Sequence, residues 1–342
     1  MIPVVRSPDA GGHVPGAEIW LGTRTLGTEV PQRVDAIEAA LADWIFIDAL
    51  PHSDEVLLRV HDPSLVEHLR TVWPRWGEYG VDRVVPYLFP TPGLLGELPL
   101  RDPVAVHAVA GRYCYDTMTL VGPGTWLAAR GAVNATLTAV GLLEVHECVY
   151  ALTRPPGHHV TRSAYGGSCY LNNAAVAAEG LRGVGHERVA IVDIDAHHGN
   201  GTQDIFYSRG DIFYCSVHVD PGAGWFPHYA GFADEVGIEA GVGANLNVPL
   251  APGAADEAWL VAIAHLVDAI SEFSATALVV SLGVDAAIDD PESPLQVTPD
   301  GFHRAGQLLR DLRLPTLAVQ EGGYDLATLG GLVRTTLEGL GR

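Results

Sequence analysis

Apolar residues gather in short runs that are hydrophobic throughout, without alternating polar positions. A strand in a parallel sheet is buried on both faces, so it lacks the alternation that marks a half-exposed strand. The pattern therefore predicts buried parallel strands. The runs that fit it lie at 148–153, 188–194, 212–218, 277–282 and 315–320.

Amphipathic stretches rich in Ala and Leu separate these runs. One of them has a clear helix start: Thr298 can cap the first turn, Pro299 suits the first helical position, and Asp300 complements the helix dipole. Alternating strands and helices predict an α/β fold with a doubly wound, mostly parallel sheet flanked by helices. The predicted helices lie at 172–184, 256–273, 299–313 and 327–340.

Residues 75–125 break this regularity, because they are rich in Pro, Gly and irregularly spaced aromatic residues. We predict that this segment is a long surface excursion with some helix. Long loops of this kind often border a functional site. No stretch has the composition of a linker, so we expect a single domain over residues 1–342.

The charge balance limits the classes of partner. The chain has 41 acidic and 20 basic residues, and its formal net charge is −21. Nucleic-acid binding needs clusters of Lys and Arg that neutralise phosphates, so this balance argues against nucleic acid as a direct partner. The negative electrostatic potential of such a protein would attract a cationic small molecule. An equally good explanation of the acidic composition is that it keeps the protein soluble.

Hydrophobic runs and cysteine spacing indicate the cellular compartment of the protein. No apolar run approaches the roughly 18 residues of a membrane-spanning helix. Residues 1–16 lack the sustained apolar stretch of a signal peptide. The absence of a CxxC pair favours buried thiols in a reducing compartment over a disulfide framework. We therefore expect a cytoplasmic protein with no membrane partner. The cysteines are Cys114, Cys148, Cys169 and Cys215.

Ionisable residues follow four of the predicted strands, at the point where each strand ends. In open α/β sheets, ligands bind beyond the carboxyl ends of the strands, and these ends meet at one edge. Side chains from distant parts of the sequence should therefore gather there and form an active site. They are His158, His159, Asp193, Asp195, His197, Asp285 and Tyr324.

Three of these residues form a candidate metal site. Asp195 and His197 stand two positions apart at a strand end, so their side chains can point the same way. With Asp285 they supply two carboxylates and one imidazole, a set that holds a divalent metal and leaves positions open for water and substrate. The alternative is a group of solvated loop residues, and the polar partners around His197 argue against it.

The adjacent His158 and His159 follow two prolines and a glycine. Asp193 and Asn200 are candidate partners for the two rings. A carboxylate raises the basicity of an imidazole and fixes its tautomer, whereas an amide only orients it. Ordinary surface histidines are the alternative explanation.

Tyr324 follows two glycines, and its hydroxyl could donate a hydrogen bond to a developing oxyanion. A tyrosine that only caps the sheet is the alternative. The chain has no P-loop and no GxSxG nucleophile motif. Water activated by a metal is therefore the expected nucleophile.

These residues lie in motifs that resemble those of the histone deacetylase superfamily, which has the arginase–deacetylase fold. The motifs are "RPPGHH", "GGSCYLNNAAVAA", "IVDIDAHHGNGTQDIFY", "SLGVDAAIDDP" and "EGGYD". A second set is similar to the bacterial acetylpolyamine amidohydrolase branch: "GPGTW", "FPHYAGFADE" and "VTPDGF". The resemblance covers nearly the whole chain.

The resemblance implies one catalytic Zn²⁺ per chain, with the ligands Asp195, His197 and Asp285. It implies a set of catalytic residues in which His159 moves the proton and His158 is its electrostatic partner: His158, His159, Asp193, Asn200 and Tyr324. It also implies a structural K⁺ beneath the zinc, at Asp193, Asp195, His197 and Ser216.

The resemblance also implies how a substrate is held. The carbonyl of Gly167 would receive the substrate amide, and Phe226 would form an aromatic wall of the channel. Ser168 stands where the family usually has Phe or Tyr facing Phe226, which should widen or polarise the slot. Trp225 is an additional aromatic residue beside this wall.

Polyamine-handling relatives carry acidic residues around the entrance. Glu18 lies at a matching place in the N-terminal loop. His107 and Met118 align with the positions where two further acids would be expected. The resemblance therefore supports the reaction type more firmly than the polyamine substrate.

The function that we expect is a zinc-dependent amidohydrolase that removes an acetyl group from an acetylpolyamine or a related small amine. Protein acetyl-lysine and a bulkier acetylated metabolite are the alternative substrates. A ureohydrolase of the same fold would need a second metal, and a non-catalytic acyl-binding protein would have lost Tyr324 or a metal ligand. The expected partner is a small acetylated amine, and a homodimer is the assembly we consider.

Overall fold

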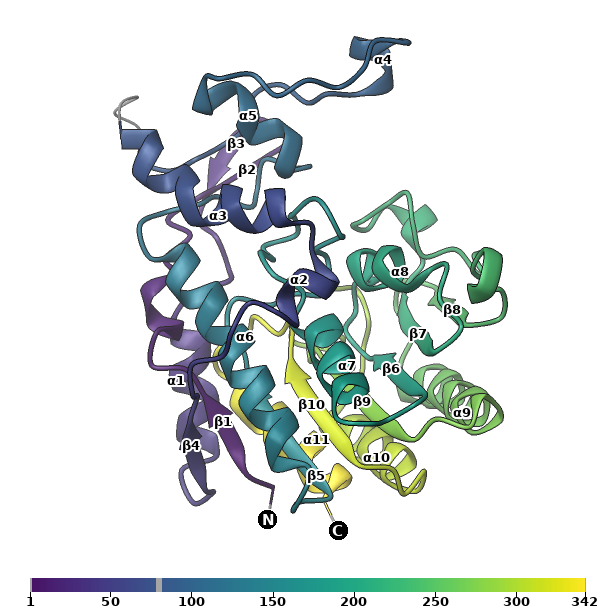
Figure 1. Ribbon diagram of the computed structural model, residues 1–342. Coiled ribbons are helices and arrows are strands. Elements are labelled where there is room, and N and C mark those ends of the chain that lie inside the picture. The colour runs from purple at the N-terminus through teal and green to yellow at the C-terminus, as the bar shows by residue number, and fades with distance from the viewer. Residues whose placement is uncertain (1, 78–81, 342) are drawn as a thin grey trace.

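A computed structural model of the protein describes residues 2–77 and 82–341, and its centre is the predicted parallel sheet (Figure 1). Within the described residues the sheet has eight strands in the order β4-β1-β5-β10-β9-β6-β7-β8. Every neighbouring pair is parallel. The fold class that the sequence predicts is therefore confirmed.

The five predicted strands form the contiguous middle of this sheet, and each lies within one residue of its expected bounds. They are β5 (Cys148–Leu152), β6 (Val189–Asp193), β7 (Ile212–Val219), β9 (Ala277–Leu282) and β10 (Thr316–Gln320). The outer strands were not predicted: β1 (Val4–Arg6), β4 (Phe46–Asp48) and β8 (Asn245–Leu250).

The four predicted helices are present as α7 (Asn173–Gly183), α9 (Asp256–Phe273), α10 (Pro299–Arg310) and α11 (Leu329–Leu340). The Thr298 hydroxyl caps α10 by accepting from the Gly301 N–H at 3.3 Å. The predicted end of this helix at residue 313 is wrong. Arg313 has a left-handed φ of 56°, so the chain has already left the helix there.

Helices cover both faces of the sheet (Figure 1). Successive residues of each central strand enter different cores: Val149 packs with α6 (Thr125–Leu142) and α7, whereas Tyr150 packs with α9, α10 and α11. This two-sided burial explains why the strands read as unbroken apolar runs.

The segment 75–125 agrees only in part with the prediction of a surface excursion. Residues 78–81 lie outside the described residues. An arm around α4 (Pro92–Leu95) projects from the body (Figure 1), but α5 (Val106–Tyr113) packs into the core through Val109 and Ala110.

Further elements surround the sheet: α1 (Gln32–Ala40), α2 (Leu57–Val60), α3 (Pro63–Trp76), α8 (Asn200–Phe206) and the antiparallel hairpin of β2 (Glu18–Trp20) and β3 (Thr23–Thr25). Among the described residues, no helix combines the length and apolar character needed to cross a membrane. Cys114, Cys169 and Cys215 are buried free thiols, and Cys148 is half-buried.

Candidate active site

The carboxyl ends of β6 and β9 bring Asp195, His197 and Asp285 together, with ligand atoms within 4.8 Å of one another. His197 Nδ1 lies 3.3 Å from Asp195 Oδ1 and 3.0 Å from Asp285 Oδ2. A tetrahedral zinc at about 2.0–2.1 Å from its ligands separates the ligand atoms by roughly 3.3 Å. The donor set and its spacing therefore fit a zinc ion.

Both carboxylates of this set are buried, and backbone groups hold them. The Gly322 N–H donates to Asp195 Oδ2 at 2.8 Å, and the Ala196 N–H donates to Asp285 Oδ1 at 2.7 Å. Burial, followed by the Asp195 charge, raises the pKa of Asp285 to about 7. Two carboxylates buried side by side need a compensating cation, which a divalent metal supplies.

The two adjacent histidines contact separate partners. His158 Nδ1 lies 3.0 Å from Asp193 Oδ2, and His159 Nδ1 lies 2.8 Å from Asn200 Oδ1. The ring centroids of the two histidines are 4.0 Å apart. The turn that carries them is fixed by Glu321 Oε2, which accepts from the Gly157 and His158 N–H groups at 2.7 and 3.2 Å.

The surroundings drive the two histidine pKa values apart. Burial acts to lower the pKa of His158, but the Asp195 and Asp193 carboxylates outweigh it and raise that pKa to about 10. Burial and the nearby charge of His158 hold the pKa of His159 well below its usual range. His158 is therefore the more basic of the two rings.

Tyr324 lies on the turn that follows β10. Its backbone N–H donates to Asp290 Oδ2 at 2.7 Å, and the Arg33 guanidinium lies 5.0 Å from the centre of its ring. Arg33 also donates to the Gly323 carbonyl at 2.7 Å. Burial raises the pKa of the Tyr324 phenol well above its usual value, despite the opposing charge of Arg33. The phenol keeps its proton and is a hydrogen-bond donor.

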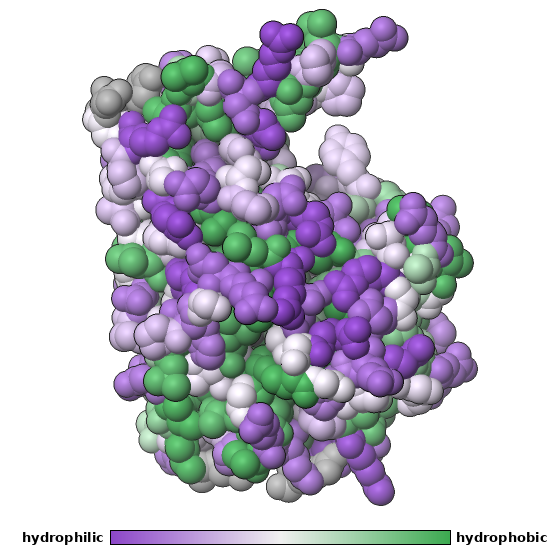
Figure 2. All heavy atoms as spheres, viewed as in Figure 1, coloured by the Kyte–Doolittle hydropathy of each residue, from purple (hydrophilic) through white to green (hydrophobic). Residues whose placement is uncertain are grey.

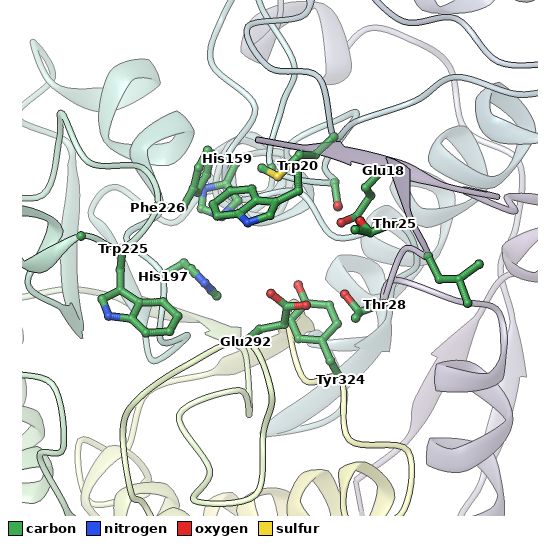
Figure 3. Close-up of a pocket in the computed structure, with 15 residues that line it drawn as sticks. Glu18, Trp20, Thr25, Thr28, His159, His197, Trp225, Phe226, Glu292 and Tyr324 are labelled. Atoms are coloured by element: carbon green, nitrogen blue, oxygen red, sulfur yellow. The ribbon is translucent and has the colours of Figure 1, made fainter. Parts of the chain in front are cut away.

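A cavity of about 370 Å³ opens over these groups (Figure 3). It is lined by Glu18, Trp20, Thr25, Leu26, Thr28, Met118, His159, Gly167, Ser168, His197, Gly224, Trp225, Phe226, Glu292 and Tyr324. The four substrate-binding residues expected from the sequence are all among them. His107 is not: it lies on α5, with its ring centroid 6.1 Å from that of Tyr87.

The wall beside His159 has an unusual backbone. Gly167 and Ser168 have left-handed φ values of 58° and 60°. A Cβ on Gly167 would collide with the His159 ring, so glycine is required there. The Phe226 ring meets the His159 ring edge-to-face, with 4.7 Å between centroids. Ser168 contributes a hydroxyl rather than an aromatic ring to this wall.

Sequence reasoning missed Glu292, Gly224, the hairpin residues Trp20 and Thr25, and Leu26 and Thr28 just after the hairpin, all of which line the cavity. Glu292 follows Asp290 and Pro291 on the loop after β9, the same loop that carries Asp285. An acidic residue on a loop at the carboxyl edge of the sheet could have been predicted from the sequence to line the cavity. The hairpin could not, because its position at the cavity entrance depends on tertiary packing.

A second group of buried ligand-type side chains is present: His158, Cys169 and Glu321. Two of its members already have partners, since His158 contacts Asp193 and Glu321 Oε2 accepts two backbone N–H groups. The group that faces the cavity through His197 is therefore the better candidate for a metal site.

A doubly wound sheet with this metal-type set and histidine pair at its carboxyl edge is the framework of a deacetylase. Residues 28–340 match the histone deacetylase domain, and the chain belongs to this family. It is 37% identical to the acetylpolyamine amidohydrolase of Mycoplana ramosa, across 94% of this chain and 95% of that protein. It is 38% identical to the acetylpolyamine amidohydrolase of Burkholderia pseudomallei, across 98% and 97% of the two chains.

Solved structures agree with these sequence relatives. The crystal structure of acetylpolyamine aminohydrolase from Burkholderia pseudomallei matches with a TM-score of 0.94 and 37% identity, covering 100% of this chain and 99% of that one. The HDA15 HD domain matches with a TM-score of 0.82 and 29% identity, covering 99% of this chain and 91% of that one.

Proposed function

We propose that this chain is a zinc-dependent amidohydrolase that removes the acetyl group from an acetylpolyamine or a related small acetylated amine. The observation that carries the proposal is one cavity bordered by His159, His197 and Tyr324, with the other two metal-type ligands directly behind His197. Relatives that match nearly the whole chain are acetylpolyamine amidohydrolases, so this substrate is favoured over protein acetyl-lysine.

Asp195, His197 and Asp285 would hold the zinc, which when bound supplies a Lewis acid and acidifies water. Because Asn200 Oδ1 accepts from His159 Nδ1, His159 Nε2 is left free to take the water proton. The same nitrogen would return a proton to the leaving amine. His158, protonated against Asp193, would stay as a fixed positive charge beside it.

The remaining residues orient the amide. The Tyr324 hydroxyl would donate to the developing oxyanion. The Gly167 carbonyl would accept the amide N–H, and the Phe226 ring would pack along the alkyl chain. The products would be a free amine and acetate.

The central test is hydrolysis of acetylputrescine, acetylspermidine and an acetyl-lysine peptide by the zinc-loaded protein, with metal analysis alongside. We expect one zinc per chain and higher kcat/KM on the two small amines than on the peptide. Asp285→Ala should lose both zinc and activity. Two tightly bound zinc ions per chain, full activity after chelation, or a preference for the peptide would contradict the proposal.

Ser168 favours a second candidate substrate, a bulkier or more polar acetylated amide. Loss of one aromatic contact to a linear chain is worth about 1 kcal/mol. Ser168→Tyr should therefore gain roughly fivefold on a linear amine such as acetylputrescine and lose activity on a bulkier amide. If the wild type already hydrolyses linear amines efficiently and Ser168→Tyr does not raise kcat/KM on them, the bulkier amide is excluded as the preferred substrate.

We also propose a structural K⁺, a homodimer and a cytoplasmic location. Ser216 pairs with Asp193 across neighbouring strands, so the two side chains lie on the same face of the sheet. A rise in melting temperature with KCl but not with LiCl would support the K⁺ site, and equal effects of both salts would refute it.

A further inference from the structure

The cavity wall that carries Gly167 and Ser168 packs against residues 115–119, the segment between α5 and α6. The two stretches are in direct contact, because a Cβ on Gly166 would collide with the Tyr115 ring. The Tyr115 N–H also donates to the carbonyl of Tyr165, the residue before this wall, at 3.2 Å. The backbone of the wall is therefore shaped by this segment.

Two consecutive backbone N–H groups of the wall donate into the segment. The Gly167 N–H donates to Asp116 Oδ2 at 2.6 Å, and the Ser168 N–H donates to Thr119 Oγ1 at 2.8 Å. The Thr119 hydroxyl donates its own proton to Asp116 Oδ2 at 3.0 Å. Because that proton is used on Asp116, a lone pair of Oγ1 is left to accept from Ser168, and the direction of both hydrogen bonds is fixed.

The Asp116 carboxylate is fully engaged by these contacts. Its Oδ1 accepts from the Met118 and Thr119 N–H groups at 2.9 and 2.8 Å, and its Oδ2 accepts the two donors described above. A carboxylate has about four acceptor positions, so four donors fill them. Neither Asp116 nor Thr119 is among the described residues that line the cavity. Both therefore act on the wall from behind.

The hydrogen bond from Ser168 to Thr119 determines where the Gly167 carbonyl points. The peptide that joins Gly167 to Ser168 contains this carbonyl and the Ser168 N–H, and in a planar trans peptide the two groups point in opposite directions. Thr119 is only 1% exposed, so the N–H is drawn into the protein interior. The carbonyl is therefore turned the other way, to the side of the cavity.

This orientation is unfavourable for Ser168 itself. Its φ of 60° is left-handed, a region in which a residue with a Cβ is sterically disfavoured. A half-turn of the Gly167–Ser168 peptide plane would change only ψ of Gly167 and φ of Ser168, and it would take Ser168 out of the left-handed region. The same half-turn would point the carbonyl away from the cavity. The hydrogen bond to Thr119 opposes this rotation.

We propose that Thr119 is a positioning residue of the active site: its hydroxyl, oriented by Asp116, locks the Gly167–Ser168 peptide with the carbonyl toward the cavity. The inference rests on the proposed amidohydrolase function, in which this carbonyl accepts the substrate amide N–H. Thr119 should therefore contribute to the hydrolysis of an amide but not to that of the matching ester, which has no N–H to donate.

The test compares N-pentylacetamide with pentyl acetate, two uncharged compounds of similar shape in which an ester oxygen replaces the amide N–H. The measured quantity is the ratio of kcat/KM on the amide to kcat/KM on the ester in the zinc-loaded protein, from the release of acetate. Thr119→Val keeps the side-chain shape and removes the hydroxyl. It should lower the ratio about threefold to tenfold, the usual effect of losing one hydrogen bond between neutral groups. Thr119→Ser keeps a hydroxyl and should keep the wild-type ratio.

Thr117→Val is the matched control. The Thr117 hydroxyl donates to the Ile19 carbonyl at 2.8 Å, so this variant loses a threonine hydroxyl from the same segment without changing a contact of the wall. Its ratio should stay at the wild-type value. A purely structural role of Thr119 would lower both rates alike, so an unchanged ratio in Thr119→Val would overturn the proposal. An equal fall in Thr117→Val or in Thr119→Ser would also overturn it.

Failure of the proposed function gives a different result. If the zinc-loaded wild type hydrolyses neither compound and none of the acetylated amines, the amidohydrolase assignment fails, and hydrogen exchange still tests the lock. Exchange is measured by mass spectrometry on peptides that cover residues 166–169. The Ser168 N–H should exchange faster in Thr119→Val than in the wild type and in Thr119→Ser. Equal exchange in all three proteins would refute the lock on its own.

Discussion

At the scale of single residues, Tyr324 combines two properties that an oxyanion donor needs. Its phenol stays protonated because burial raises its pKa, and Arg33 and Asp290 hold the backbone of its turn. Tyr324→Phe should lower kcat by about two to three orders of magnitude, as for other oxyanion donors. Zinc content and melting temperature should stay at wild-type values, and near-normal turnover would show a purely structural role.

The charge of Glu18 should make substrate binding depend on pH. Its raised pKa of about 7 means that the carboxyl is largely neutral below pH 7 and ionised above it. The substrate ammonium, with a pKa of roughly 10, keeps its charge in this range. The Kd of acetylputrescine should therefore fall as the pH rises from 6 to 8.

Calorimetry of the zinc-loaded Tyr324→Phe variant, in which turnover of the substrate is slow, measures this effect. The other charges that act on Glu18 come from Glu292, Asp116 and Glu29. Glu18→Gln in the same background should flatten the dependence, and N-pentylacetamide should show none. A Kd for acetylputrescine that does not change between pH 6 and 8 would contradict the assignment of Glu18.

At the scale of elements, a buried ion cluster joins the N-terminal segment to the catalytic turns. Glu29 Oε1 contacts Arg33 Nη1 at 3.0 Å and Arg154 Nε at 2.8 Å, and all three side chains are buried. Arg33 reaches the turn before Tyr324, and Arg154 reaches the carbonyls of Ala10 and His13. One carboxylate thus anchors two arginines that each tie down a separate loop.

Removing that carboxylate should be costly, because it leaves two buried guanidinium groups without their counter-ion. Glu29→Gln should lower the free energy of unfolding by about 3–5 kcal/mol. Glu38→Gln, which removes a partly exposed partner of Arg6, should change it by less than about 1 kcal/mol. Urea denaturation of both variants checks this, and equal small losses would show that the cluster contributes little.

The elements also show what the sequence could and could not predict. The central strands were recoverable because burial on both faces leaves an unbroken apolar run, as in β9. The outer strands β1 and β4 have three residues each, too few to carry a pattern. Asp195, His197 and Asp285 follow the ends of strands, and a parallel sheet brings those ends together, so their proximity was predictable. Glu292 reaches the cavity on a loop whose path depends on contacts with Asp290, which the sequence does not show.

At the scale of the whole molecule, the arm around α4 projects from the body and bears apolar residues on its surface (Figures 1 and 2). Leu94 is 54% exposed and Leu98 is 71% exposed. An arm that leaves its own core cannot bury these side chains within the chain. The proposed homodimer would cover them with a second copy, since exposed apolar patches mark interaction surfaces.

Size-exclusion chromatography with light scattering tests this assembly. The wild type should have twice the mass of one chain, and Leu94→Asp combined with Leu98→Asp should convert it to a monomer. Val145→Asp, an exposed apolar residue on the opposite end of the sheet, should leave the dimer intact. A monomeric wild type, or a dimer that survives the double change, would exclude the arm as the interface.

The four strands that deliver the reacting groups, β5, β10, β9 and β6, are neighbours in space but come from distant parts of the chain. Tyr324 lies on the turn after β10, which follows the other three strands in the sequence. Because β10 lies between β5 and β9, the histidine pair and the metal-type set cannot reach their final separation until that strand is inserted. A chain from which β10 and its following turn are missing therefore has no assembled site, even though every metal-type ligand and both histidines are present in its sequence.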